Sequence, residues 1–264
     1  MRIASIQMIS GPEVGPNLDA AARHIAAAAA DGARLVALPE YFPLIGASDE
    51  TRLAVREQPG AGPIQDFLAD AARRHGIWLV GGSIPLAAND PGKLLNSCLV
   101  FDDQGRQVAR YDKIHLFGFT KGAEHYDEAA TIEPGQGVVA FDSPFGRIGL
   151  AICYDLRFPE LFRAMGPVDL IVLSAAFTET TGRSHWETLL RTRAIENQCY
   201  LLASAQGGQH PTGRMTHGNS MIIDPWGDIV ARMDKGEGVV AAELDPARIA
   251  EVRTSLPALQ HRKL

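Results

Sequence analysis

The chain has 264 residues, of which 46% are hydrophobic and 21% charged, and its formal net charge is −6. These proportions are typical of globular proteins, and the length allows one large α/β domain or two small ones. The acidic balance, without any basic patch, argues against nucleic acid or an anionic membrane as a partner. No apolar run approaches the roughly 18 residues that a membrane span requires. No linker-like stretch divides the chain, so we expect a single domain over residues 1–264.

The three cysteines also limit the class of protein. Cys98, Cys153 and Cys199 are too few and too scattered for a disulfide framework, and none belongs to a C-x-x-C pair. Their odd number, together with an N-terminus that resembles a strand more than a signal peptide, fits a reducing compartment. We therefore expect a cytoplasmic protein.

The first half of the chain alternates strand and helix patterns. In chain order they predict strand Arg2–Met8, helix Asn17–Asp31, strand Arg34–Leu38, helix Pro63–His75, strand Ile77–Val80, and a hairpin of Leu94–Phe101 with Gln107–Tyr111. Gly32 and Gly76 follow the two helices, where glycine commonly ends a helix.

The second half continues this alternation. It predicts strands Val138–Phe141 and Arg147–Ile152, helix Arg157–Met165, strand Leu170–Leu173, helix Ser184–Asn197, strands Cys199–Ser204, Ser220–Ile223, Ile229–Arg232 and Val239–Glu243, and helix Pro246–Thr254. Strands that alternate with helices and hairpins indicate mixed sheets flanked by helices. About a dozen strands are too many for one flat sheet, so we expect two packed sheets.

Three polar residues directly follow apolar strands. Glu40 follows the strand that ends near Leu38, and Lys113 and Cys153 follow two others. In layered α/β folds ligands bind at the carboxyl ends of strands. If these strands are neighbours and run the same way, a carboxylate, an ammonium and a thiol meet in one site.

Such a site could transfer an acyl group to water. A free thiol has a pKa near 8.5, so a carboxylate such as Glu40 would take the proton of Cys153 as its sulfur attacks. Lys113 and the backbone N–H of Tyr154 could stabilise the developing oxyanion. The alternative is that Cys153 is a small buried hydrophobic residue and that Glu40 and Lys113 are surface charges.

Three blocks of sequence, in a fixed order, resemble the nitrilase superfamily of carbon–nitrogen hydrolases. They are Leu38–Tyr41, Tyr111–Leu116 and Gly149–Glu160. The resemblance implies an α-β-β-α sandwich of two mixed sheets, a linear amide as substrate, and no metal or organic cofactor. It also implies a homodimer or higher homo-oligomer that packs through helices, including the helix after Cys153.

The same resemblance assigns the catalytic residues. It implies a triad of Glu40, Lys113 and Cys153, and a second glutamate, Glu128, that orients the lysine and positions the substrate. Glu124 competes with Glu128 for this match and is interpreted as a loop charge.

Within the superfamily, several stretches are most similar to the amidases that hydrolyse deaminated glutathione, with ω-amidases close behind. These stretches are Thr181–Glu187, Arg193–Tyr200, Ala205–His210 and Ser220–Gly227. The similarity implies hydrolysis of deaminated glutathione to 2-oxoglutarate and Cys-Gly, a metabolite repair reaction. The alternatives are ω-amidase activity on 2-oxoglutaramate, N-carbamoyl amino acid hydrolysis, and a catalytically silent interaction module. Asn219, which stands where the family usually has histidine, bears on the choice of substrate.

Residues that follow strand ends are also candidates for the substrate pocket. Tyr154 follows Cys153, while Ala176 and Phe177 follow the strand that ends near Ser174. For Phe177 a packing role is an open alternative. Arg157 could meet a substrate carboxylate, although an ion pair with Asp155 or Glu160 is the preferred interpretation, and the loop Gly207–His217, which contains Arg214, could bind a carboxylated substrate tail.

Overall fold

The computed structural model describes residues 1–46, 48–122 and 124–263. The elements are, in chain order, β1 (Arg2–Gln7), α1 (Val14–Ala30), β2 (Leu35–Ala37), α2 (Asp49–Ala54), α3 (Pro63–His75), β3 (Trp78–Val80), β4 (Ile84–Ala87), β5 (Leu94–Phe101), β6 (Gln107–Asp112), β7 (Gly118–Lys121), β8 (Glu124–Asp127), the 3₁₀ turn η1 (Glu128–Ala130), β9 (Ala140–Ser143), β10 (Gly146–Ile152), the 3₁₀ turn η2 (Cys153–Arg157), α4 (Pro159–Ala164), β11 (Leu170–Ala175), α5 (Glu179–Asn197), β12 (Tyr200–Ala205), β13 (Met221–Ile223), β14 (Ile229–Arg232), β15 (Gly238–Glu243) and α6 (Pro246–Ser255).

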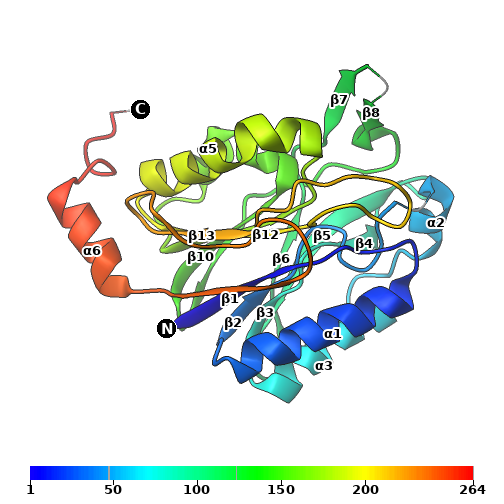
Figure 1. Cartoon of the computed structure of the whole chain (residues 1–264), viewed down its shortest axis with the longest axis horizontal. Helices are drawn as coiled ribbons and strands as arrows, with labels where there is room; N and C mark the ends of the chain where they lie inside the picture. Colours follow the sequence, from blue (N-terminus) through cyan, green and yellow to red (C-terminus); the bar gives the residue numbers. More distant parts are fainter. Residues whose placement is uncertain (47, 123, 264) are drawn as a thin grey trace.

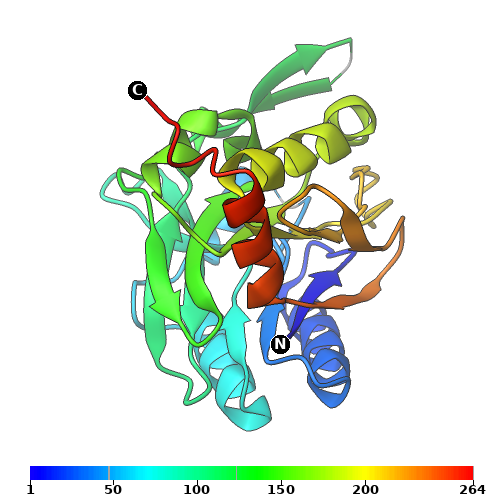
Figure 2. The same ribbon diagram turned by 90° about the vertical axis from the view of Figure 1, so that its left-hand side faces the viewer.

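Two mixed sheets form the centre of the molecule. The first has the order β15-β1-β2-β3-β5-β4, with β6 also paired to β5, and the second has the order β14-β13-β12-β11-β10-β9. Helices α1 and α3 cover the outer face of the first sheet, and α5 covers the outer face of the second (Figures 1 and 2). The α-β-β-α sandwich expected from the sequence is thus confirmed. No helix among the described residues has the length and apolar character needed to cross a membrane.

The strands at the centre of the sandwich are buried on both faces. Every residue of β11 and β12 is buried, as are five of the six residues of β1. Strands covered on both faces read as continuous apolar runs because neither face meets water. This explains why the sequence pattern located these strands with little error.

Buried serines join the two sheets directly. Ser5 Oγ donates to the carbonyl oxygen of Ala203 at 2.8 Å, and Ser174 Oγ donates to that of Leu38 at 2.9 Å. Facing sheets usually lie about 10 Å apart, so a hydroxyl can reach the opposite backbone only where small side chains let the sheets come close. The bond to Leu38 fixes the end of the strand that precedes Glu40 against the second sheet.

The structure adds elements that the sequence pattern did not predict: α2, β4 and the β7–β8 hairpin. The hairpin is polar and projects from the sandwich (Figure 1), so it has no apolar alternation to mark it. Strand β4 contains Pro85. It pairs with the same edge of β5 as β3 does, and Gly81 and Gly82 interrupt the chain between β3 and β4. Proline inside a short apolar run argues against a strand, except at such an edge or bulge.

Three predicted helix starts were also wrong, and the first helix, α1, begins at Val14 rather than at Asn17. Helix α5 begins at Glu179 rather than at Ser184, because Thr178 caps it by accepting a hydrogen bond from Thr181 N at 3.3 Å. The predicted helix Arg157–Met165 is replaced by the turn η2 and the short α4, which begins at Pro159. The residue before a proline disfavours helical backbone angles, so the two pieces cannot merge into one helix.

Gly82 sits where two segments of the first sheet come into contact. Its φ is +60°, and a Cβ atom there would lie 2.2 Å from the carbonyl oxygen of Pro39, beside Glu40. Gly76, at the end of α3, has the same φ of +60° but no atom within 4 Å of such a Cβ. Alanine substitutions at Gly82 and Gly76 can therefore separate the cost of the left-handed backbone angle from the cost of the clash with Pro39.

We expect Gly76→Ala to lower the free energy of unfolding by about 1 kcal/mol, the cost of a left-handed alanine. Gly82→Ala should lower it by about 3 kcal/mol or more, because the alanine also displaces the backbone of Pro39. Urea unfolding of both variants measures the difference. Equal losses of unfolding free energy in the two variants would show that the backbone at Pro39 shifts to accommodate the alanine at no cost.

Candidate active site

Glu40 lies in the turn that follows β2 and is buried inside the sandwich. Its Oε1 accepts hydrogen bonds from Asn96 Nδ2 at 3.0 Å and from Lys113 Nζ at 2.9 Å. Its backbone carbonyl oxygen accepts one from Gln206 Nε2 at 3.1 Å. The next residue, Tyr41, has a φ of +56°, an uncommon conformation for a residue with a side chain. Contacts from both sheets therefore fix the position of this carboxylate.

Lys113 follows β6, and its side chain is fully buried between two carboxylates. Nζ lies 2.9 Å from Glu40 Oε1 and 2.8 Å from Glu128 Oε2. The backbone N–H of Lys113 donates to the carbonyl oxygen of Asn96 at 2.9 Å. A buried ammonium needs such partners, because removing its charge from water is costly.

Glu128 is the first residue of η1, after the β7–β8 hairpin. Its Oε1 accepts a hydrogen bond from the Tyr41 hydroxyl, and its Oε2 accepts one from Phe117 N, each at 2.8 Å. Glu124 instead accepts a hydrogen bond from Thr180 Oγ1 at 2.6 Å. Of the two candidates for the second family glutamate, Glu124 and Glu128, it is thus Glu128 that contacts Lys113.

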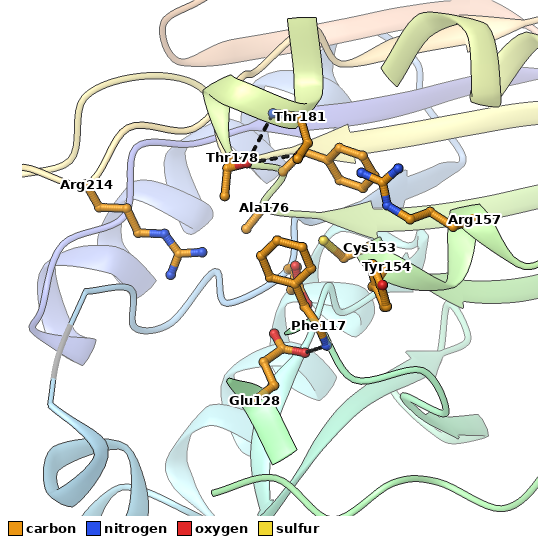
Figure 3. A pocket seen from close by; sticks show the side chains of 11 residues that line it. Phe117, Glu128, Cys153, Tyr154, Arg157, Ala176, Thr178, Thr181 and Arg214 are labelled. Carbon is orange, nitrogen blue, oxygen red and sulfur yellow. Dashed lines mark hydrogen bonds between the residues drawn. The ribbon is translucent and has the colours of Figure 1, made fainter. Parts of the chain in front are cut away.

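Cys153 ends the apolar run of β10 and opens η2. Its φ is +50°, a left-handed conformation that costs energy in a residue with a side chain. The thiol lines the same cavity as Glu40, and the charges of Glu40 and Lys113 both act on its pKa. Figure 3 shows the sulfur at the centre of a cavity. The sharp turn therefore directs the thiol of Cys153 away from the sheet and toward the two charged groups.

A buried carboxylate, Asp155, ties the cysteine turn to the lysine loop. Its Oδ2 accepts hydrogen bonds from Ile152 N at 2.9 Å and from the Tyr111 hydroxyl at 2.7 Å. Its Oδ1 accepts one from His115 N at 3.1 Å and lies 2.7 Å from His115 Nδ1. Asp155 thus holds the segments on either side of Lys113 against the turn of Cys153. From the sequence, Asp155 is predicted only as a possible ion-pair partner for Arg157.

The protonation states of the site follow from burial and from these contacts. Burial raises the pKa of the Cys153 thiol well above its usual value, and the neighbouring Glu40 carboxylate raises it further. Burial also raises the pKa of Glu40, against the opposing attraction of Lys113. For Lys113, burial alone would lower the pKa, but Glu128 and Glu40 hold it well above the usual range. The site therefore pairs a protonated thiol and a permanent cation with a carboxylate of raised pKa.

A narrow cavity leads to this group of residues (Figure 3). It is lined by Glu40, Phe117, Glu128, Cys153, Tyr154, Arg157, Ala176, Phe177, Thr178, Thr181 and Arg214. The three residues predicted to bind substrate, Tyr154, Ala176 and Phe177, are all among them. Phe117 and Thr178 were not predicted to line the site, because nothing in their local sequence pattern marks them. Thr181 was noted only as the start of a stretch that resembles deaminated glutathione amidases.

Two arginines reach the cavity from different segments. The guanidinium of Arg157 lies 3.0 Å from His185 Nδ1 and packs over the rings of Tyr154 and Phe177, at 5.7 and 5.3 Å from their centroids. The preferred interpretation of Arg157, an ion pair with Asp155 or Glu160, is wrong, because within the described residues its guanidinium contacts His185 and two aromatic rings and forms no ion pair with either acid. Arg214 enters from the loop Gly207–His217.

Asn219, the departure from the family pattern, lies outside the cavity lining. Its Nδ2 donates to the carbonyl oxygen of His217 at 2.7 Å, and its Oδ1 accepts from Arg232. Its φ is +59°, which asparagine adopts more readily than most residues. Asn219 therefore shapes a loop without lining the cavity.

Comparison with known proteins identifies the family. The family model described as carbon-nitrogen hydrolase matches residues 2–254. The deaminated glutathione amidase of Synechocystis sp. is 41% identical over 98% of this chain and 97% of its own length. An omega-amidase of Xenopus laevis is 36% identical over 99% of this chain and 95% of its own. The crystal structure of Saccharomyces cerevisiae Nit3, a member of branch 10 of the nitrilase superfamily, is similar with a TM-score of 0.89 at 30% identity, covering 100% of this chain and 97% of that one.

The chain belongs to the carbon-nitrogen hydrolase family, within the nitrilase superfamily, and is an amidase that acts on linear amides. Among the residues that the structure describes, no three His, Cys, Asp or Glu side chains are grouped so that they could hold a metal ion.

The pKa shifts predict a pH profile for amide hydrolysis. Glu40 can take the thiol proton only when ionised, so kcat/KM should fall as the pH drops through the Glu40 pKa. Because burial raises that pKa above the ordinary glutamate value of 4.5, the loss should begin at a higher pH than for an exposed glutamate. Lys113, with a pKa above the usual 10.5, should cause no loss below that pH. A profile of kcat/KM with an acidic limb at or below 4.5 would contradict this ionisation scheme.

Proposed function

We propose that Cys153 is the nucleophile of this amidase and Glu40 its general base. Glu40 takes the thiol proton while the sulfur attacks the amide carbon, and the same proton then passes to the departing nitrogen. The resulting thioester is hydrolysed by a water molecule that Glu40 activates. One observation carries the proposal: Glu40 and Cys153 line the same cavity, where the Glu40 carboxylate also bonds to Lys113 Nζ at 2.9 Å.

Lys113 and Tyr154 supply the electrostatic part of the mechanism. The ammonium of Lys113 and the backbone N–H of Tyr154 stabilise the oxyanion of the tetrahedral intermediate. Glu128 orients the ammonium, since it accepts a hydrogen bond from Lys113 and is itself held by Tyr41 and Phe117. An intact set of these groups also disfavours a silent interaction module.

For the substrate we propose deaminated glutathione, cleaved to 2-oxoglutarate and Cys-Gly. The 41% identity with a deaminated glutathione amidase supports this choice. So does the position of Arg157, which lines the cavity between Tyr154 and Phe177 and can bind the carboxylate of the 2-oxoacyl end. Ala176 completes the wall at the end of β11. The principal alternative is ω-amidase activity on 2-oxoglutaramate, favoured by the 36% identity with an omega-amidase, ahead of N-carbamoyl amino acid hydrolysis.

The substrate proposal predicts a ranking of activities. The value of kcat/KM for deaminated glutathione should exceed those for 2-oxoglutaramate and an N-carbamoyl amino acid by about tenfold or more. Steady-state kinetics on the purified protein measures all three. If kcat/KM is highest for 2-oxoglutaramate, the enzyme is an ω-amidase. If it is highest for the N-carbamoyl amino acid, both the deaminated glutathione and the ω-amidase proposals are wrong. As control, Cys153→Ala should lower kcat at least about 10⁴-fold while the thermal midpoint stays close to that of the wild type.

The protein is further proposed to be a cytoplasmic, single-domain homodimer. The match over residues 2–254 supports one domain over residues 1–264. An apolar hollow supports the dimer, because Ile195, Trp226 and Leu256 line it and are 47%, 51% and 49% exposed. Large apolar side chains gathered on a surface commonly mark an interface.

The dimer has its own test. Trp226→Glu should shift the protein from dimer to monomer, because a charge would have to be buried in the apolar contact. Sedimentation equilibrium measures the mass. Val108→Glu, at an exposed position on β6 away from the hollow, is the matched control and should remain dimeric. A wild-type protein that sediments as a monomer would end the dimer proposal.

A further inference from the structure

Arg214 is a cation of the cavity that the proposed mechanism does not use. Its guanidinium packs over the ring of Tyr126 at 5.5 Å from the centroid. Its Nε is buried and makes no hydrogen bond to any described residue. A buried donor without a partner is costly, so a side chain held in this way is suited to receive an acceptor from a ligand.

The backbone around Arg214 is held in place by a buried histidine. The carbonyl oxygen of Arg214 accepts a hydrogen bond from His210 N at 2.8 Å. The ring of His210 lies 2.8 Å from the carbonyl oxygen of Ser10 and 2.8 Å from Thr216 Oγ1. This loop is therefore a fixed support for the arginine, which reduces the entropy lost when a ligand binds.

The charges of the cavity also call for a second cation. Glu40, Glu128 and Lys113 together leave one negative charge, which would repel an anionic substrate. The guanidinium of Arg157 neutralises that one negative charge and leaves no net positive charge to attract an anion. With Arg214 as well, the site carries one net positive charge, which attracts an anionic substrate, and each of two carboxylates can have its own cation.

Arg214 and Arg157 lie on different sides of Cys153 (Figure 3). Arg157 is four residues beyond Cys153, on the same turn. The loop that carries Arg214 is linked to Glu40, since the ring of His210 bonds to Ser10 and Gln206 Nε2 donates both to Ser10 Oγ at 2.9 Å and to the Glu40 carbonyl oxygen. Glu40 delivers the proton to the departing amine, so the leaving group must lie on the side of Glu40.

We propose that Arg214 binds a carboxylate carried by the departing amine, so that the enzyme prefers amides of amino acids or dipeptides to primary amides. The inference rests on the proposed function, and it assigns the two carboxylates of one substrate to two arginines. An extended dipeptide spans about 7 Å. A carboxylate at its far end is thus beyond the cysteine turn and requires a cation on another segment of the chain.

The test compares two substrates that differ only at the leaving group. One is deaminated glutathione, and the other is its C-terminal carboxamide, in which the carboxylate is replaced by a neutral group. The wild type should favour the acid by about tenfold to hundredfold in kcat/KM, mostly through KM. In Arg214→Gln the ratio should fall to near one, and Arg214→Lys should restore part of it.

Two further variants control for other effects of charge. Arg157→Gln should lower kcat/KM for both substrates and leave their ratio high, since both share the 2-oxoacyl end. Arg74→Gln removes an exposed arginine of α3 that does not line the cavity, and its ratio should equal that of the wild type. Thermal unfolding verifies that each variant is folded.

The outcomes separate the two proposals. If the wild type hydrolyses deaminated glutathione but the ratio is near one, or stays high in Arg214→Gln, the function stands and the assignment of Arg214 is wrong. If the ratio of kcat/KM for the acid to that for the carboxamide falls as far in Arg74→Gln as in Arg214→Gln, the preference comes from general electrostatic attraction. That result would also overturn the assignment of Arg214. If the wild type hydrolyses neither compound, the proposed function fails and this inference fails with it.

Discussion

A buried ammonium held between two carboxylates is the constraint on which the site depends. Lys113 is fully buried, and Glu40 and Glu128 lie within 2.9 Å and 2.8 Å of its Nζ. Transfer of such charges out of water costs several kcal/mol per ion, which is offset only when geometry and further hydrogen bonds are favourable. Here Asn96 bonds to Glu40, and both Tyr41 and Phe117 bond to Glu128. The hydrogen bonds that offset the burial of these charges also fix the positions of the three side chains. Loss of any one partner would leave a charge buried without compensation.

This constraint connects elements from both halves of the fold. Glu40 and Lys113 follow β2 and β6 of the first sheet, whereas Cys153 follows β10 of the second. Inter-sheet bonds such as that of Ser174 to Leu38, and the bridge made by Asp155, hold the two sets of strand ends together. The sandwich thus acts as a frame in which rigid strands carry the reactive groups and the connecting loops carry the groups that surround a substrate.

The sequence predicted the sandwich because its central strands and long helices have strong apolar periodicity. It placed Glu40, Lys113 and Cys153 after strands, but their convergence depends on how two sheets face each other, which no local pattern encodes. Glu128 was found only through resemblance to a family, since it lies in a polar segment beside an unpredicted hairpin. Asp155, Phe117 and Thr181 gain their significance from contacts with residues distant in the chain, so they carry no signal of their own. The catalytic and binding roles of the predicted residues stay predictions until the variants are measured.

The protonated state of the Cys153 thiol has a consequence for the durability of the protein. Peroxide attacks thiolates, and oxidation to sulfenic acid and beyond proceeds fastest at exposed sulfurs of low pKa. Cys153 is 7% exposed and its pKa is raised, while burial raises the pKa of Cys98 and Cys199 to about 12. At neutral pH the thiols of Cys98 and Cys199 therefore offer little thiolate to an oxidant, and that of Cys153 depends on the Glu40 carboxylate to accept its proton.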